Sequence, residues 1–182
     1  MFRFMKALLS FYMLSLFLAY SCNGVTGQME QERKQTEQNV KNNIETYITS
    51  CWNQNDVESL QTITTSKFVR TLNGIKVVAS QKEMQAHINV FAKGFPDMNV
   101  SLENMSLIED KVFLKWHFTG LNSGIYGECA PTDKKVKISG LSQMTFDKNG
   151  ILLKEDTYFN DLSLMQQLGY QLFPPTKEVI SN

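Results

Sequence analysis

The spacing of apolar residues changes from a helical to a strand-like period near the middle of the chain. Before residue 95, apolar side chains recur every three or four positions, as on the buried face of a helix. Residues with this spacing are Val40, Ile44, Tyr47, Ile48, Cys51 and Trp52, then Val57, Leu60 and Ile63, and finally Met84, Ile88 and Phe91. The capping box Ser80-Gln81-Lys82-Glu83 begins the last of these helices, and Gly94 ends it.

From residue 97 onward, apolar and polar residues alternate, which is typical of strands with one buried face. The pattern predicts long strands over 100–108, 111–119, 135–146 and 151–159, and a short pair over 67–72 and 75–78 joined by Asn73-Gly74. A last short helix over 162–168 ends at Gly169. Helices first and a meander of strands last predict an α+β fold, with N-terminal helices covering one face of a curved antiparallel sheet.

The first 22 residues are typical of a targeting segment. Arg3 and Lys6 precede an apolar run of about 14 residues, which is signal-peptide length and short for a membrane span. Small residues then lead to a cysteine in Leu18-Ala19-Tyr20-Ser21-Cys22, which resembles the lipobox of bacterial lipoproteins. The resemblance implies acylation of Cys22 and a lipid-anchored place in the bacterial cell envelope, facing the periplasm or the surface. An ordinary signal peptide that is cut nearby is the alternative.

The composition of each segment predicts how the chain divides into regions. We expect a signal peptide over 1–22, a polar flexible tether over 23–36, one folded domain over 37–173 and a tail over 174–182.

The chain has 18 basic and 18 acidic residues without a basic patch, which argues against nucleic acid as a partner. Cys51 and Cys129 could pair in an oxidising compartment, although Cys51 equally fits the buried helix face. No Cys/His spacing predicts a metal site.

Several short motifs follow one another through residues 37–170. They are Trp52-Asn53-Gln54-Asn55-Asp56, Gly94-Phe95-Pro96-Asp97, Trp116 with Thr119-Gly120, Pro131-Thr132 ahead of Lys134-Lys135-Val136, Tyr158-Phe159 and Gln167-Leu168-Gly169. In order and spacing they resemble the SnoaL-like polyketide cyclases, also called ester cyclases. The resemblance implies the nuclear transport factor 2-like fold, a cone-shaped α+β barrel with a pocket between sheet and helices. It also implies an intramolecular aldol cyclisation without a cofactor, with an Asp as general acid and base and a His in a Gly-Thr-His-like turn.

At both of those positions this chain has an asparagine. Asn160 stands where the resemblance places the Asp, and Asn122 stands where it places the His. An amide can hydrogen-bond a carbonyl group but cannot take up and return a proton at neutral pH. We therefore expect the pocket to bind a small, mostly apolar ligand without the family's cyclase chemistry. The residues expected to line it are Trp116, Asn122, Tyr126, Tyr158 and Asn160.

Two alternatives stay open. One is a cyclase-like or isomerase-like enzyme whose acid–base group is Asp156, which alternates with Tyr158 on one strand face, or His87 on the covering helix. The other is an interaction protein whose open sheet face pairs with a partner or with a second copy to form a homodimer. Next to Asn160, Asp161 is expected to cap the last helix rather than to replace the missing acid.

Overall fold

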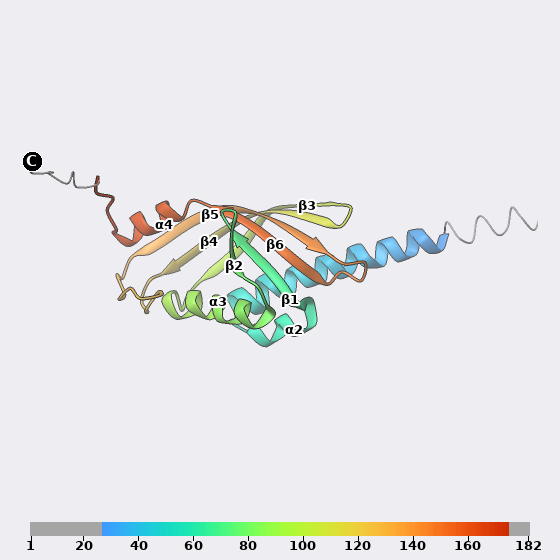
Figure 1. Cartoon of the computed structure of the whole chain (residues 1–182), viewed down its shortest axis with the longest axis horizontal. Helices are drawn as coiled ribbons and strands as arrows, with labels where there is room; N and C mark the ends of the chain where they lie inside the picture. The colour runs from blue at the N-terminus through green and yellow to red at the C-terminus, as the bar shows by residue number, and fades with distance from the viewer. Residues whose placement is uncertain (1–26, 175–182) are drawn as a thin grey trace, which may run out of the picture.

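The computed structural model describes residues 27–174, which form one sheet with helices on one of its faces (Figure 1). The N-terminal helix over residues 27–46, α2 (Leu60–Ile63) and α3 (Gln81–Gly94) lie on the same side of this sheet. Two short helical segments, η1 (Tyr47–Asn53) and η2 (Val57–Ser59), connect the first helix to α2. The predicted α+β class is confirmed. The predicted signal peptide, Cys22 and the tail from residue 175 onward lie outside the described residues.

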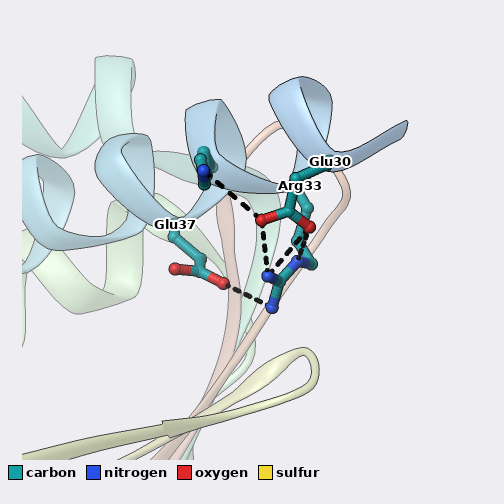
Figure 2. A network of polar contacts seen from close by, with 4 residues as sticks. Glu30, Arg33 and Glu37 are labelled. Carbon is teal, nitrogen blue, oxygen red and sulfur yellow. Dashed lines mark hydrogen bonds and ion pairs between the residues drawn. The ribbon is translucent and has the colours of Figure 1, made fainter. Parts of the chain in front are cut away.

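Residues 27–36, which belong to the predicted tether, are helical. Arg33 contacts Glu30 at 2.9 Å and Glu37 at 3.3 Å, one turn before and one turn after it (Figure 2). Pairs at this spacing stabilise an exposed helix by about 0.2–0.5 kcal/mol each. The polar composition of this segment suggested a tether, whereas the spacing of its charges supports a helix.

The same helix is attached to the body of the domain by side-chain amides and a hydroxyl. Thr36 Oγ1 donates a hydrogen bond to the carbonyl of Lys148 at 2.7 Å, and Asn43 Nδ2 donates to that of Gly150 at 2.7 Å. Between them, Asn39 Nδ2 donates to the carbonyl of Asn149 at 3.1 Å. Positions 36, 39 and 43 lie on one helical face, so the helix follows the turn that joins the last two strands.

The sheet has six strands in the order β2-β1-β6-β5-β4-β3. Their bounds are β1 (Thr64–Leu72), β2 (Ile75–Val78), β3 (Asn99–Ile108), β4 (Lys111–Leu121), β5 (Lys135–Phe146) and β6 (Leu152–Phe159). Strands β3 to β6 form the predicted antiparallel meander, but β1 pairs with β6 in parallel. The sheet is therefore mixed, curved and unclosed, which corrects the expectation of an antiparallel sheet in a barrel (Figure 1).

Local signals place the turns where they were predicted. Asn73 and Gly74 both have positive φ, 51° and 84°, as a type I′ hairpin between β1 and β2 requires. Helix α3 begins at the predicted capping box, in which the Ser80 side chain accepts a hydrogen bond from the Glu83 backbone N–H at 3.2 Å. The Glu83 carboxylate accepts in turn from the N–H of Ala79 at 2.8 Å.

The cap of the last helix, α4 (Asp161–Leu168), differs from the prediction. Asn160, not Asp161, is its N-cap, because the Asn160 side-chain oxygen accepts from the N–H of Ser163 at 2.9 Å. The Asp161 side chain instead accepts from the N–H of Leu162, the next residue. Asparagine and aspartate are equally good N-caps, so their order alone could not decide between the two.

The core lies between the helices and the inner face of the sheet. Tyr47, Cys51 and Phe68 are essentially inaccessible there, as is Met84 of α3. Cys51 and Cys129 are both free thiols, and Cys51 packs as a small buried side chain. Over residues 27–174, no helix combines the length and apolar character that crossing a membrane requires.

Candidate functional site

A narrow cavity lies between the inner face of the sheet and the N-terminal helices. Its wall is mostly apolar, with Tyr47, Ile48, Trp52, Phe91, Val100, Leu114, Trp116, Phe118, Ile138, Met144 and Phe159, and its other lining residues are Arg70, Ser142 and Glu155. It contains about 490 Å³ of space between atoms when its mouth is included, but only about 40 Å³ is wide enough for the centre of a water molecule. A ligand larger than a few water molecules therefore requires side chains at the mouth to move. Ile48, Trp116 and Phe159 are the half-buried residues of the lining.

Strand register determines how the cavity wall is built. Trp116, Gly140 and Phe159 are paired neighbours across β4, β5 and β6. The Trp116 indole lies over Gly140, where a Cβ would collide with it, so this position requires glycine. One step along the strands, Ser142 is paired with Thr157. In the following row Glu155 of β6 is paired with Arg70 of β1. Polar inward-facing residues thus lie next to an aromatic row.

The polar residues form a buried network around the Glu155 carboxylate. Tyr47 donates a hydrogen bond to Glu155 Oε2 at 2.7 Å, and Ser142 donates to Oε1 at 2.8 Å. Ser142 accepts in turn from Trp116 Nε1 at 3.1 Å, and its hydroxyl lies 2.7 Å from that of Thr157. Burial, followed by the charge of Glu155, raises the pKa of Tyr47 well above its usual value, so Tyr47 acts as a neutral donor.

Arg70 completes this network with an ion pair. Its Nη1 lies 3.6 Å from Glu155 Oε2, and its guanidinium Cζ lies 5.0 Å from the centroid of the Trp52 ring. Arg70 is 6% exposed and Glu155 is 3% exposed, so the pair is buried. Among the described residues, Nε and Nη1 of Arg70 have no hydrogen-bond partner. Buried pairs are normally stabilised by such hydrogen bonds, so this arginine is incompletely satisfied by the protein.

Asp156 and Tyr158 point away from the cavity, contrary to the prediction. Thr145 of β5 is paired with Lys154 and Phe146 with Leu152, so Leu153 is an extra residue in β6. Such a bulge inverts the faces of all residues after it. Glu155 and Thr157 are therefore the inward residues of this strand, and Tyr158 is 53% exposed.

On the outer face, Asp156 is held by its neighbours. It contacts Lys154 at 2.8 Å and accepts a hydrogen bond from Thr71 Oγ1 at 2.7 Å. Partial burial opposes ionisation of Asp156, but the hydrogen bonds from Lys154 and Thr71 outweigh it and lower its pKa. A carboxyl group with a lowered pKa that faces away from the cavity does not fit the role of its general base.

Asn122 is buried, but its side chain organises a loop instead of lining the cavity. Its Nδ2 donates to the carbonyls of Gly94 and Gly124, each at 3.0 Å. Its Oδ1 accepts from the N–H and the hydroxyl of Thr132, each at 2.9 Å. These four contacts occupy both N–H groups of the amide and give its oxygen two donors, which leaves the amide engaged by the protein.

Of the other expected pocket residues, only Trp116 lines the cavity. Tyr126 packs against Phe91 and Phe95, with ring centroids 5.2 Å away in each case, and burial raises its pKa to about 12. It therefore anchors the loop to α3 as a core aromatic. Asn160 is exposed and engaged as the α4 cap.

His87 lies behind the cavity wall rather than in it. Its ring is 6.3 Å from that of Trp52 and 5.3 Å from that of Phe91. Burial, followed by the positive charge of Arg70, lowers the pKa of His87 to about 3. The imidazole is therefore neutral and a weak base near pH 7. No group of three or more His, Cys, Asp or Glu side chains within residues 27–174 is arranged to hold a metal ion.

Comparisons with known proteins agree with the motif resemblance. The family model of the SnoaL-like polyketide cyclases matches residues 42–168. A solved structure from Jannaschia sp. CCS1 that carries this family name is 17% identical, with a TM-score of 0.66, over 74% of this chain and 94% of its own. AclR of Streptomyces galilaeus is 20% identical, with a TM-score of 0.63, over 73% of this chain and 97% of its own.

A third similar structure is IdmH of Streptomyces antibioticus. It is 17% identical, with a TM-score of 0.62, over 72% of this chain and 99% of its own. No curated protein sequence matches the chain significantly. At these identities the solved structures show a shared fold, and the family model identifies the family.

Proposed function

Because this chain belongs to the SnoaL-like polyketide cyclase family, we propose that it binds a small, mostly apolar ligand in its cavity without the family's cyclase chemistry. One observation carries the proposal. The two positions expected to transfer protons are Asn122 and Asn160, and both amides are engaged in backbone hydrogen bonds outside the cavity. Neither can take up a proton from a ligand.

The lining of the cavity supports an apolar ligand. Aromatic rings from η1 and from the sheet, among them Trp52, Trp116 and Phe159, line the narrow space. Ligand sites of this kind are largely apolar, with a few polar groups that orient the bound molecule. In this cavity, the network around Glu155 supplies those polar groups.

Binding can be tested with a neutral dye, N-phenyl-1-naphthylamine, whose fluorescence rises in apolar surroundings. We expect saturation at one site per chain. Ile138→Phe fills the cavity and should weaken binding about tenfold, while the matched control Leu141→Phe, on the outer face of the same strand, should bind like the wild type. Equal binding by both variants, with circular dichroism showing both folded, contradicts the proposed site.

We also propose that Cys22 anchors the domain to a membrane by acylation. The support is the apolar run that ends in Leu18-Ala19-Tyr20-Ser21-Cys22. Feeding an alkyne-labelled fatty acid to expressing bacteria should label the wild type and Cys129→Ser but not Cys22→Ser. Labelling of Cys22→Ser, or its retention in the membrane fraction, contradicts the anchor.

A second function, acid–base catalysis, is favoured by one residue that the sequence did not suggest. Within residues 27–174, Glu155 is the carboxylate that lines the cavity. Its oxygens already accept from Tyr47 and Ser142, so a substrate proton must compete with both donors. This competition favours binding over proton transfer.

The two functions differ in what they do to an α-proton. A bound methyl ketone, 2-acetylnaphthalene, exchanges its methyl protons in D2O faster if a base in the cavity removes them. Under binding alone, the exchange rate with saturating protein equals the rate without protein. Acceleration by the wild type that is lost in Glu155→Gln but kept in Asp156→Asn identifies an enzyme instead.

Self-association through the outer sheet face is a further proposal. Phe113, Leu141 and Tyr158 are 42%, 59% and 53% exposed on that face, and the last two are paired neighbours across β5 and β6. Exposed apolar groups in contact often mark an interface. Sedimentation should show dimers that Leu141→Lys shifts towards monomers, and an unchanged distribution contradicts this surface.

A further inference from the structure

We propose that the ligand carries a carboxylate and that Arg70 is the residue that binds it. This inference rests on the proposed function, because it specifies the polar group of a ligand held in the same cavity. It predicts an apolar acid with a flat body, oriented with its carboxylate towards β1 and its body between the aromatic rings.

Arg70 is fixed in position on two sides. Strand register pairs it with Glu155 across the parallel β1–β6 contact, and its guanidinium lies over the ring of Trp52. Both contacts restrict the side chain to the cavity wall, where it is 6% exposed. A guanidinium held in this way loses little further freedom when it binds an anion.

The hydrogen-bonding capacity of this guanidinium is not used by Glu155. The closest approach, Nη1 to Oε2, is 3.6 Å, which is too long for a hydrogen bond. Tyr47 already donates to that oxygen at 2.7 Å, and Ser142 donates to the other at 2.8 Å. Glu155 therefore offsets the charge of Arg70 while Nε and Nη1 keep no partner among residues 27–174.

An unpartnered buried N–H destabilises the folded state, and one on a charged group does so more strongly. A ligand oxygen that accepts from Arg70 recovers that energy. Arginine has donors and no acceptor, so its partner must be an acceptor, and an anionic one forms the stronger hydrogen bonds. A ligand without an acceptor oxygen gains nothing from these N–H groups.

The nearby titratable groups do not compete for this role. Tyr47 is a neutral donor to Glu155, and His87, whose ring packs against Trp52, is neutral near pH 7 because its pKa is lowered to about 3. Trp116 Nε1 is engaged by Ser142. Arg70 is thus the cationic group of the wall, and the rest of the wall is apolar or paired.

The test compares two probes of one shape, 2-naphthoate and the neutral 2-naphthamide. Calorimetry measures their affinities, and quenching of Trp52 and Trp116, the two tryptophans of the chain, reports occupation of the cavity. We expect the wild type to bind 2-naphthoate about tenfold more tightly than 2-naphthamide. Arg33→Met, which removes an exposed arginine from the N-terminal helix, should keep this preference.

Arg70→Met alone leaves the Glu155 carboxylate buried and unpaired and so threatens folding. The double variant Arg70→Met/Glu155→Gln removes both charges and keeps a side chain that Tyr47 and Ser142 can hydrogen-bond. In it the two probes should bind with equal affinity, because the cation that distinguishes a carboxylate from a neutral amide is absent. Glu155→Gln alone removes the competing anion and should strengthen 2-naphthoate binding.

The outcomes separate the two proposals. Equal affinity of the wild type for both probes, or a preference that survives in the double variant, overturns the role of Arg70 and leaves apolar binding in place. Failure of the wild type to bind either probe overturns the proposed function together with this inference. Loss of preference only in the double variant supports both.

Discussion

The buried position of His87 predicts how the stability of the domain depends on pH. Burial beside Trp52 and the charge of Arg70 lower the pKa of His87 to about 3, whereas an unfolded chain has a histidine pKa of about 6.5. Between these values the unfolded state binds a proton that the folded state does not. The free energy of unfolding therefore falls as the pH falls below about 6.5. Above that value both states hold a neutral His87, and the stability that depends on its low pKa is fully present.

The magnitude follows from the two pKa values. Each pH unit between them is worth about 1.4 kcal/mol, so lowering the pH from 7 to 5 should cost about 2 kcal/mol through His87 alone. Carboxylates also titrate as the solution becomes acidic. They do so equally in a His87→Leu variant, which fills a similar volume and has no proton to bind.

The assay is urea unfolding followed by circular dichroism at pH 7 and pH 5. The wild type should lose about 2 kcal/mol more than His87→Leu between the two pH values. In the control His117→Gln, the other histidine of the chain is removed and His87 is kept, so the loss should still exceed that of His87→Leu. Equal losses in the wild type and His87→Leu would refute the reasoning and restore His87 as a candidate base near neutral pH.

Two further predictions concern the asparagines and the cavity wall. Asn122→Ala leaves the carbonyls of Gly94 and Gly124 without their donor and should lower the free energy of unfolding in urea by about 3 kcal/mol. The cap variant Asn160→Ala should lower it by about 1 kcal/mol. Equal losses would contradict the loop-organising role of Asn122. Gly140→Ala places a Cβ against the Trp116 indole, so tryptophan emission should shift and N-phenyl-1-naphthylamine binding should weaken. Unchanged emission would contradict the packing of Trp116 on Gly140.

Elements with local signals could be predicted from the sequence. The hairpin at Asn73-Gly74 and the capping box at Ser80 depend on residues that are adjacent in the chain, and both lie as expected. The alternation in β4 likewise placed Trp116 on the inner face. The turn and the cap form through contacts between neighbours in sequence, and the alternation in β4 follows which of its side chains face the core, so a pattern of a few residues contains the information.

The polar part of the site could not be predicted in this way. Arg70 meets Glu155 because β1 pairs with β6 in parallel, which is a contact between distant segments. Asp156 was expected to reach the cavity from the strand face that it shares with Tyr158, but the extra residue at Leu153 inverts the alternation of β6, so Glu155 occupies the inner face. The signal that could have helped is Ser142, a polar residue in phase with the buried Met144 of β5.

Native mass spectrometry of the protein isolated from its native host will show whether the cavity holds an apolar acid. We expect a complex of one chain with one small molecule, which organic extraction releases and which fragments as an apolar carboxylic acid. The cavity-filled variant Ile138→Phe should retain less of it than the matched outer-face variant Leu141→Phe. A wild-type chain that carries no small molecule, or one that carries a cationic or strongly polar one, would contradict the account.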